Sequence, residues 1–124
     1  AVERKDTNEF IGFTGIHVLE ADDSLDFEFL PCIEIGWRLQ KKHWNQGFAT
    51  EAARGVLKFV ERQTDIKEVY AYTAVRNIPS INIMEKIGME PIRTFDHPDI
   101  ADGHSLKQHV LFKKSTQKER RFKL

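Results

Sequence analysis

The residues best suited to chemistry lie between positions 43 and 53, where the chain reads His-Trp-Asn-Gln-Gly-Phe-Ala-Thr-Glu-Ala-Ala. Gly47 and the small Ala49 allow a ligand to approach the backbone without meeting a branched side chain. Where a loop runs into a helix, the first helical N–H groups have no intrahelical partner, and the helix dipole places partial positive charge beside them. The segment therefore predicts a phosphate site formed mainly by backbone amides from Gln46 to Thr50.

Two sequence features narrow the type of phosphate site. No Lys follows Gly47 as in a Walker loop, and the Gly-x-Gly-x-x-Gly of a dinucleotide-binding fold does not occur in the chain. The same residues also fit a tight loop that precedes an ordinary helix. The elements on either side of the loop bear on this choice.

Hydrophobic periodicity predicts those elements. Cys32 to Leu39 alternates as a half-buried strand, with one face formed by Ile33, Ile35, Trp37 and Leu39 and the other by Glu34, Gly36 and Arg38. Apolar residues then recur with helical spacing from Thr50 to about Gln63, and Glu68 to Val75 is rich in strand-forming residues. A strand, a helix and a second strand over this length form a right-handed crossover, which makes the two strands parallel.

The remaining elements flank this unit. The sequence predicts a hairpin of Ala1–Lys5 with Phe10–Leu19, a helix from Pro79 to Ile87 that stops at Gly88, and strands at Met89–Phe95 and Gln108–Lys113. Gly12 and Gly15 indicate a bulge or close packing in the second strand, and close packing on the sheet is one reason for Gly55 inside a helix.

Glu34 stands out because it is the only carboxylate within the predicted central strand. An unpaired charge in an apolar strand is costly, so the residue needs a reason to be there. Two interpretations are equally open at this point. Glu34 is either a general base or a structural partner of Arg38 or another basic group. His17 in the neighbouring strand is expected to be a packed or half-exposed residue rather than a catalyst.

Composition restricts the class of protein. The 124 residues predict one domain, and 19 basic against 19 acidic residues give no global field for a nucleic acid or an anionic membrane. No apolar run reaches membrane-spanning length, and no signal peptide is recognised. The single Cys32 excludes an internal disulfide and suits a reducing cytoplasm, and no Cys/His spacing indicates zinc. We therefore expect a cytoplasmic protein without metal, nucleic-acid partner or membrane partner.

Two segments carry a family resemblance. Glu34–Leu39 followed by Trp44–Ala53 resembles the acetyl-CoA segment of the GNAT superfamily of N-acyltransferases, and Asn77–Ser80 with Glu85–Met89 resembles its second cofactor segment. The pattern Trp44-x-x-Gly47-x-Ala49 is similar to the ribosomal-protein N-acetyltransferase-like branch, with Trp44 in place of the commoner Gln or Arg. The likeness covers roughly Phe10 to Lys113.

The resemblance implies an α/β fold. It consists of a mixed, mostly antiparallel sheet with a central splayed parallel strand pair and flanking helices. The chain starts after the N-terminal strand and two helices that GNAT domains normally carry. We expect residues 1–114 to form a GNAT-like acetyl-CoA-binding domain and residues 115–124 a basic tail that is frayed rather than an RNA-binding arm. A sheet edge or face left uncovered near the first strand of this chain would favour association, so we expect self-association into a homo-oligomer.

The resemblance also implies a cofactor site. The acetyl-pantetheine arm lies in the gap between the parallel strands, along the backbone of Trp37, Arg38 and Leu39. The other cofactor contacts that it implies are Trp44, Asn45, Gln46, Gly47, Phe48, Ala49, Thr50, Asn77 and Ser80. Ser80 has two open roles, a hydroxyl near the sulfur or a helix-start cap.

The implied reaction is direct transfer of an acetyl group from acetyl-CoA to a primary amine of a small molecule or a protein N-terminus. Glu34 is the expected catalytic base, and Ser80 or water the expected acid. Met84 occupies the position of the usual Tyr acid and cannot donate a proton. Met84 and the late start of the chain favour an alternative, a non-catalytic acyl-CoA-binding or interaction module with a GNAT fold.

Two polar segments add secondary hypotheses. The acidic stretch Glu20–Leu30 is either a solvated connection or a negatively charged lip that attracts an amine. His97 and His104 lie in a polar loop, where they either steer the acceptor or order the loop.

Overall fold

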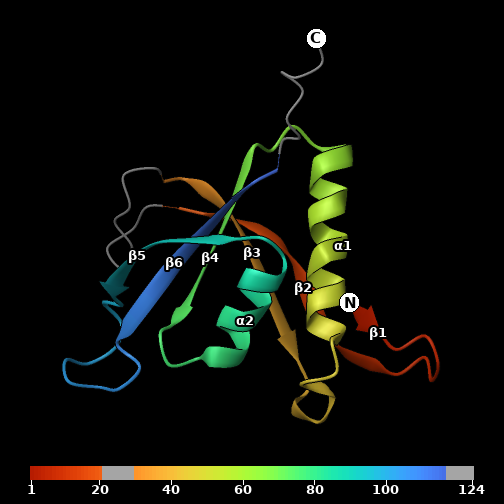
Figure 1. The fold of residues 1–124 in the computed structure, drawn as a ribbon, viewed down its shortest axis with the longest axis horizontal. Helices are drawn as coiled ribbons and strands as arrows, with labels where there is room; N and C mark the ends of the chain where they lie inside the picture. Colours follow the sequence, from red (N-terminus) through yellow and green to blue (C-terminus); the bar gives the residue numbers. More distant parts are fainter. Residues whose placement is uncertain (21–29, 117–124) are drawn as a thin grey trace.

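The computed structural model describes residues 1–20 and 30–116, which form one six-stranded sheet with two helices on the same face (Figure 1). The strands are β1 (Val2–Glu3), β2 (Phe10–Leu19), β3 (Cys32–Leu39), β4 (Glu68–Ala74), β5 (Glu90–Asp96) and β6 (Gln108–Ser115). The helices are α1 (Phe48–Gln63) and α2 (Ile78–Lys86), and a 3₁₀ turn, η1 (Lys41–His43), precedes α1. The strand order is β1-β2-β3-β4-β6-β5, and only the β3–β4 pair is parallel among these neighbours.

The predicted fold class is confirmed, and several boundaries are confirmed with it. The predicted strand Phe10–Leu19 has the observed limits of β2, and β1 pairs with it as the expected hairpin. Several boundaries need correction. The strand predicted at Ala1–Lys5 is limited to Val2–Glu3, and the helix predicted at Pro79–Ile87 runs from Ile78 to Lys86. The helix α1 begins at Phe48 rather than Thr50, and β6 continues to Ser115 rather than ending at Lys113.

The parallel strands β3 and β4 separate soon after they meet. They share one register pair, Glu34 with Tyr70, whereas β2 and β3 pair continuously from Gly12–Leu39 to Leu19–Cys32. Beyond that pair the two arrowheads point apart in Figure 1. The splayed strand pair is therefore present. The end of β3, beyond Glu34, has no partner strand on the β4 side.

The helix-covered face of the sheet holds the main core. From α1, the predicted inward residues Ala53, Leu57 and Val60 are buried. Met84 of α2 and Ile87, the C-cap of α2, join them. Their partners on the strands include Ile35, Val69, Ala71 and Phe112, and Met89 just before β5 packs with them. The opposite face carries a smaller cluster around Tyr70 and Leu111.

Glycine positions give a mixed outcome. Gly88 has a left-handed φ of 91° and follows Ile87, the C-cap of α2, so the predicted helix stop is confirmed. A methyl group at Gly12 would overlap the carbonyl oxygen of Arg38, which confirms close packing there. The same expectation is wrong for Gly15 and Gly55, because no described atom lies within 4 Å of a methyl group placed at either residue.

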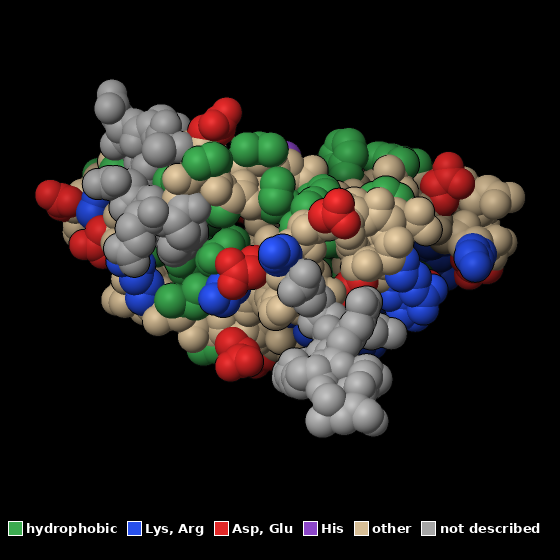
Figure 2. Space-filling view, turned by 90° about the horizontal axis from the view of Figure 1, so that it is seen from above, with side chains coloured by type: hydrophobic (Ala, Val, Ile, Leu, Met, Phe, Trp, Pro, Cys, Tyr) green, Lys and Arg blue, Asp and Glu red, His purple; other side chains and the backbone are tan. Residues whose placement is uncertain are grey.

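The surface mixes charge types. Figure 2 shows both basic and acidic side chains across one face, beside exposed apolar side chains. The acidic residues of the predicted lip, Asp22, Asp23, Asp26 and Glu28, lie outside the described residues, as do residues 117–124 of the predicted basic tail 115–124. Within the described ranges, neither helix has the length and apolar character needed to cross a membrane.

Gly55 offers a test of the helix packing. We expect Gly55→Ala to raise the free energy of unfolding by about 1 kcal/mol, because Ala is the better helix former and its methyl group meets open space. Urea unfolding followed by circular dichroism measures the change. Gly88→Ala is the control and should destabilise the protein, because Gly88 has a positive φ and its added methyl group would meet Lys114. Equal or lower stability of Gly55→Ala would contradict the open environment of this position.

Candidate functional site

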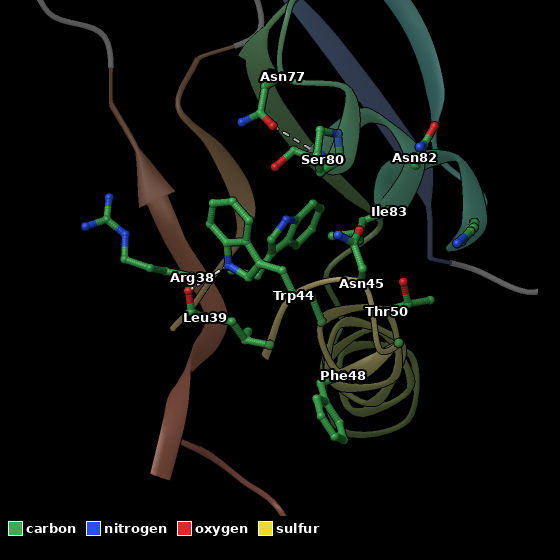
Figure 3. Close-up of a pocket in the computed structure, with 15 residues that line it drawn as sticks. Arg38, Leu39, Trp44, Asn45, Phe48, Thr50, Asn77, Ser80, Asn82 and Ile83 are labelled. Atoms are coloured by element: carbon green, nitrogen blue, oxygen red, sulfur yellow. Dashed lines mark hydrogen bonds between the residues drawn. The ribbon is translucent and has the colours of Figure 1, made fainter. Parts of the chain in front are cut away.

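A cavity of about 460 Å³ opens where β3 and β4 separate, between the starts of the two helices (Figure 3). The structure brings most of the predicted cofactor residues around it, namely Trp37, Arg38, Leu39, Trp44, Asn45, Gly47, Phe48, Ala49, Thr50, Asn77 and Ser80. Gln46 does not line the cavity, and its side-chain amide donates to the carbonyl of Lys42 at 3.1 Å.

The start of α1 forms one wall of this cavity. Gly47 adopts a left-handed φ of 85° at the N-cap position, and no side chain caps the helix. Its carbonyl accepts the first helical hydrogen bond, from Glu51 N–H at 3.0 Å. The N–H groups of Phe48, Ala49 and Thr50 precede that bond and lie at the positive end of the helix dipole. This wall has the chemistry of an anion site.

Trp44 fixes the loop before α1 to the end of β3. Its indole Nε1–H donates to the Leu39 carbonyl at 2.9 Å, so this strand-end acceptor is occupied within the protein. Phe48 contributes only through its backbone, because its ring points away from the other labelled residues in Figure 3. The Arg4 guanidinium lies 5.0 Å from the centroid of that ring.

The 3₁₀ turn before α1 is anchored to the β1–β2 connection. Lys42 Nζ lies 2.8 Å from a carboxylate oxygen of Glu9, and this contact lowers the pKa of Glu9. His43 is buried beside it, with its Nε2 at 3.7 Å from the other Glu9 oxygen. The turn is thereby held against β2, which places the loop relative to β3.

The start of α2 forms the opposite wall. Asn77 is its N-cap, with Oδ1 accepting from Ser80 N–H at 3.3 Å and Nδ2 donating to the Thr73 hydroxyl at 3.1 Å. The alternative role of Ser80 as the side-chain cap is therefore wrong. The Ser80 hydroxyl has no hydrogen-bond partner in the described part of the chain, which leaves it free at the cavity wall.

Glu34 lies at the point where the strands part but outside the cavity lining. It faces His17 across the β2–β3 pair, and the His17 Nε2 is 2.8 Å from Glu34 Oε1. Its side chain is 15% exposed, against 63% for His17. The suggested pairing with Arg38 is not found, and His17 takes that place. Burial raises the pKa of Glu34, while the charge of His17 acts in the opposite direction.

Sequence reasoning missed one side of the cavity. Four residues of α2 complete the lining, namely Pro79, Asn82, Ile83 and Lys86. Their spacing is i, i+3, i+4 and i+7, which is the signature of one helix face and could have identified them. Met84 lies on the other side of the helix and is 2% exposed in the core, so it does not reach the cavity.

Both histidines of the polar loop after β5 accept hydrogen bonds from the backbone of that loop, which supports the predicted ordering role. His97 Nδ1 accepts from Asp99 N–H at 3.2 Å, and His104 Nδ1 accepts from Leu106 N–H at 3.0 Å. Lys107 Nζ also donates to the carbonyl of His97. Among the described residues, no group of three or more His, Cys, Asp or Glu side chains is placed to hold a metal ion.

Comparison with known proteins gives consistent matches. The model of the acetyltransferase (GNAT) domain matches residues 1–90. The uncharacterized protein YkkB of Bacillus subtilis (strain 168) is 33% identical over 92 residues, which cover 74% of this chain and 50% of that protein. The chain spans about a third to a half of the length of the first curated relatives it matches.

Solved structures show the same fold. An acetyltransferase (GNAT family) from Bacillus anthracis is similar with a TM-score of 0.69 and 23% identity, over 92% of this chain and 63% of that one. The ribosomal L7/L12 alpha-N-protein acetyltransferase RimL, in complex with coenzyme A, is similar with a TM-score of 0.61 and 14% identity. That match covers 68% of this chain and 47% of the RimL chain.

The environment of Glu34 predicts an unusual titration. We expect its carboxyl pKa to lie above the ordinary value for Glu, because burial disfavours the charged form. In His17→Ala the pKa should rise further, since the cation that favours the carboxylate is lost. Carboxyl-detected NMR measures both values, and Glu9, whose pKa is lowered, serves as the internal control. A Glu34 pKa at or below that of Glu9 would contradict this description.

Proposed function

The chain belongs to the GNAT acetyltransferase family, and from this premise we propose that it transfers the acetyl group of acetyl-CoA to a primary amine. The observation that carries the proposal is the cavity between β3 and β4, with an uncapped helix start on one wall and a free hydroxyl on the other. The acceptor is a small molecule or a protein N-terminus.

The cavity suits acetyl-CoA in its chemistry. The pyrophosphate would accept hydrogen bonds from the N–H groups of Phe48, Ala49 and Thr50, in the field of the helix dipole. The pantetheine arm would run along the end of β3, where Trp37 and Arg38 have no partner strand on the β4 side. Acetyl-CoA supplies the thioester that the amine attacks.

Glu34 is the proposed base. His17 holds Oε1, and Oε2 has no hydrogen-bond partner among the described residues, so it is available to accept a proton from the amine. The amine nitrogen forms the bond to the acetyl carbon as the carbon–sulfur bond breaks. Ser80, or a water bound to it, would then protonate the departing thiolate.

A second candidate function has one observation in its favour. Met84 is buried in the core, so the usual Tyr position of the family offers no acid here. A binding module that holds an acyl-CoA without transferring the acyl group would need the cavity but neither Glu34 nor Ser80. Turnover and CoA binding measured on the same preparation separate the two functions.

Gly47 tests the cofactor placement. Gly47→Val should weaken CoA binding, because the β-branched side chain strains the left-handed backbone and fills the space beside the first helical amides. Gly103→Val is the matched control, since Gly103 has a similar φ of 82°, also faces open space and lies away from the cavity. Calorimetry with CoA compares the two. If both variants bind CoA as the parent does, the phosphate is not held at Gly47.

Glu34 tests the catalytic assignment. Glu34→Gln keeps the size of the side chain but removes the base, so the acetylation rate should fall roughly 10²–10⁴-fold with CoA affinity retained. Steady-state kinetics with a panel of primary amines provides the rate, and calorimetry provides the affinity. An unchanged rate would remove Glu34 from the mechanism.

A further inference from the structure

The sheet face opposite the helices has a bare strip beside Glu34. Gly15 of β2 and Gly36 of β3 are directly paired in register, so two neighbouring positions on this face carry no side chain. No described atom lies within 4 Å of a methyl group placed on either glycine. A side chain would be tolerated at both positions, yet the space above them is empty in the described part of the structure.

Charged groups lie at both ends of the Gly15–Gly36 pair, which we call the glycine floor. The His17–Glu34 pair precedes it in the ladder and the Phe13–Arg38 pair follows it. Strand alternation puts Glu34, Gly36 and Arg38 on the same face. Phe13 is 59% exposed and adds an apolar wall at the Arg38 end. The floor is therefore bounded by a carboxylate at one end and by a guanidinium with a ring at the other.

The two charged groups have unused hydrogen-bonding capacity. Arg38 makes no hydrogen bond or ion pair with any residue that the structure describes, and Glu34 Oε2 is likewise without a partner there. In Figure 3 the Arg38 side chain extends away from Thr50, Ser80 and Ile83, on the far side of β3 from the helices. Its guanidinium is thus not directed at the proposed CoA site.

The spacing suits a small ligand. Glu34 and Arg38 are four residues apart in one strand, with about 13 Å between their backbones, and strand alternation puts both side chains on the face that the two glycines leave bare. A molecule with an amine and an anionic group a few bonds apart would reach both ends with charge-assisted hydrogen bonds. A neutral amine would leave the Arg38 guanidinium unused.

We propose that the acceptor is a small amine that carries its own anionic group, seated on the Gly15–Gly36 floor with its amine at Glu34 and its anion at Arg38. This inference rests on the proposed acetyl transfer and names the class of acceptor. The anion is a carboxylate or a phosphate, since Arg forms forked hydrogen bonds with both. Glu34 belongs to the register pair that β3 shares with β4, so the amine end of the proposed acceptor lies next to the point where these strands part.

The first experiment measures acceptor binding to the CoA-saturated protein by calorimetry. The matched pairs are 4-aminobutyrate against its amide and phosphoethanolamine against ethanolamine. We expect the anionic member of at least one pair to bind about 10- to 100-fold more tightly, the scale of a hydrogen bond to a charged group. The better pair identifies carboxylate or phosphate. Arg38→Gln should abolish the preference between the two members.

The second experiment fills the proposed acceptor site above the glycine floor. Gly15→Val adds a strand-favouring side chain over the floor, so the protein should fold while the KM of the anionic acceptor rises at least tenfold and CoA affinity stays unchanged. Gly55→Ala is the matched glycine control, also facing open space but on α1, and should leave that KM unaltered.

The outcomes separate this inference from the proposed function. Acetylation of both members of each pair with equal kcat/KM, or equal binding of both, would overturn the acceptor class while acetyl transfer stands. Preference for a peptide N-terminus over every anionic amine would overturn it as well. Selective anion binding that Arg38→Gln removes, without any turnover, would support the proposed acceptor site and count against acetyl transfer.

Discussion

The structure depends on the early separation of β3 and β4. A sheet strand that loses its neighbour exposes backbone N–H and C=O groups, and these need other partners. Part of the requirement is met locally, where the Trp44 indole donates to the Leu39 carbonyl. The remaining opening becomes the cavity, so a defect in sheet pairing supplies the space in which a thioester could be held between two strands.

Packing of α1 sets the direction of its positive end. Ala53, Leu57 and Val60 bury one face of the helix against the sheet, and this fixes where the first turn points. The N–H groups that we propose as pyrophosphate ligands are therefore located by apolar contacts one to three turns away. The Glu9–Lys42 ion pair and the Trp44 hydrogen bond then fix the loop that enters the helix. Side-chain phosphate ligands are not required for such a site.

The sequence predicted the parts that depend on local pattern and missed those that depend on register. Alternation was sufficient for β2 and β3, and Gly47 and Gly88 were correctly placed at a helix start and a helix stop. The partner of Glu34 was not readable, because strand alternation does not say which residue of β2 lies opposite. The sequence left the cap of α2 open, since Asn77 and Ser80 are both good caps, and only the observed start at Ile78 decides for Asn77.

One strand supplies both halves of the proposed site because its side chains alternate. Trp37 and Leu39 face the helices and border the cofactor cavity, whereas Glu34 and Arg38 face the opposite side, where the acceptor is proposed to lie. A shift of β3 by one residue against β2 would exchange these faces, burying the two charges in the core and exposing the apolar residues. The cost of burying unpaired charges is several kcal/mol, so the register that the core requires also places the proposed cofactor site and the proposed acceptor site on opposite faces. Chemistry between them is then confined to the gap where β3 and β4 part.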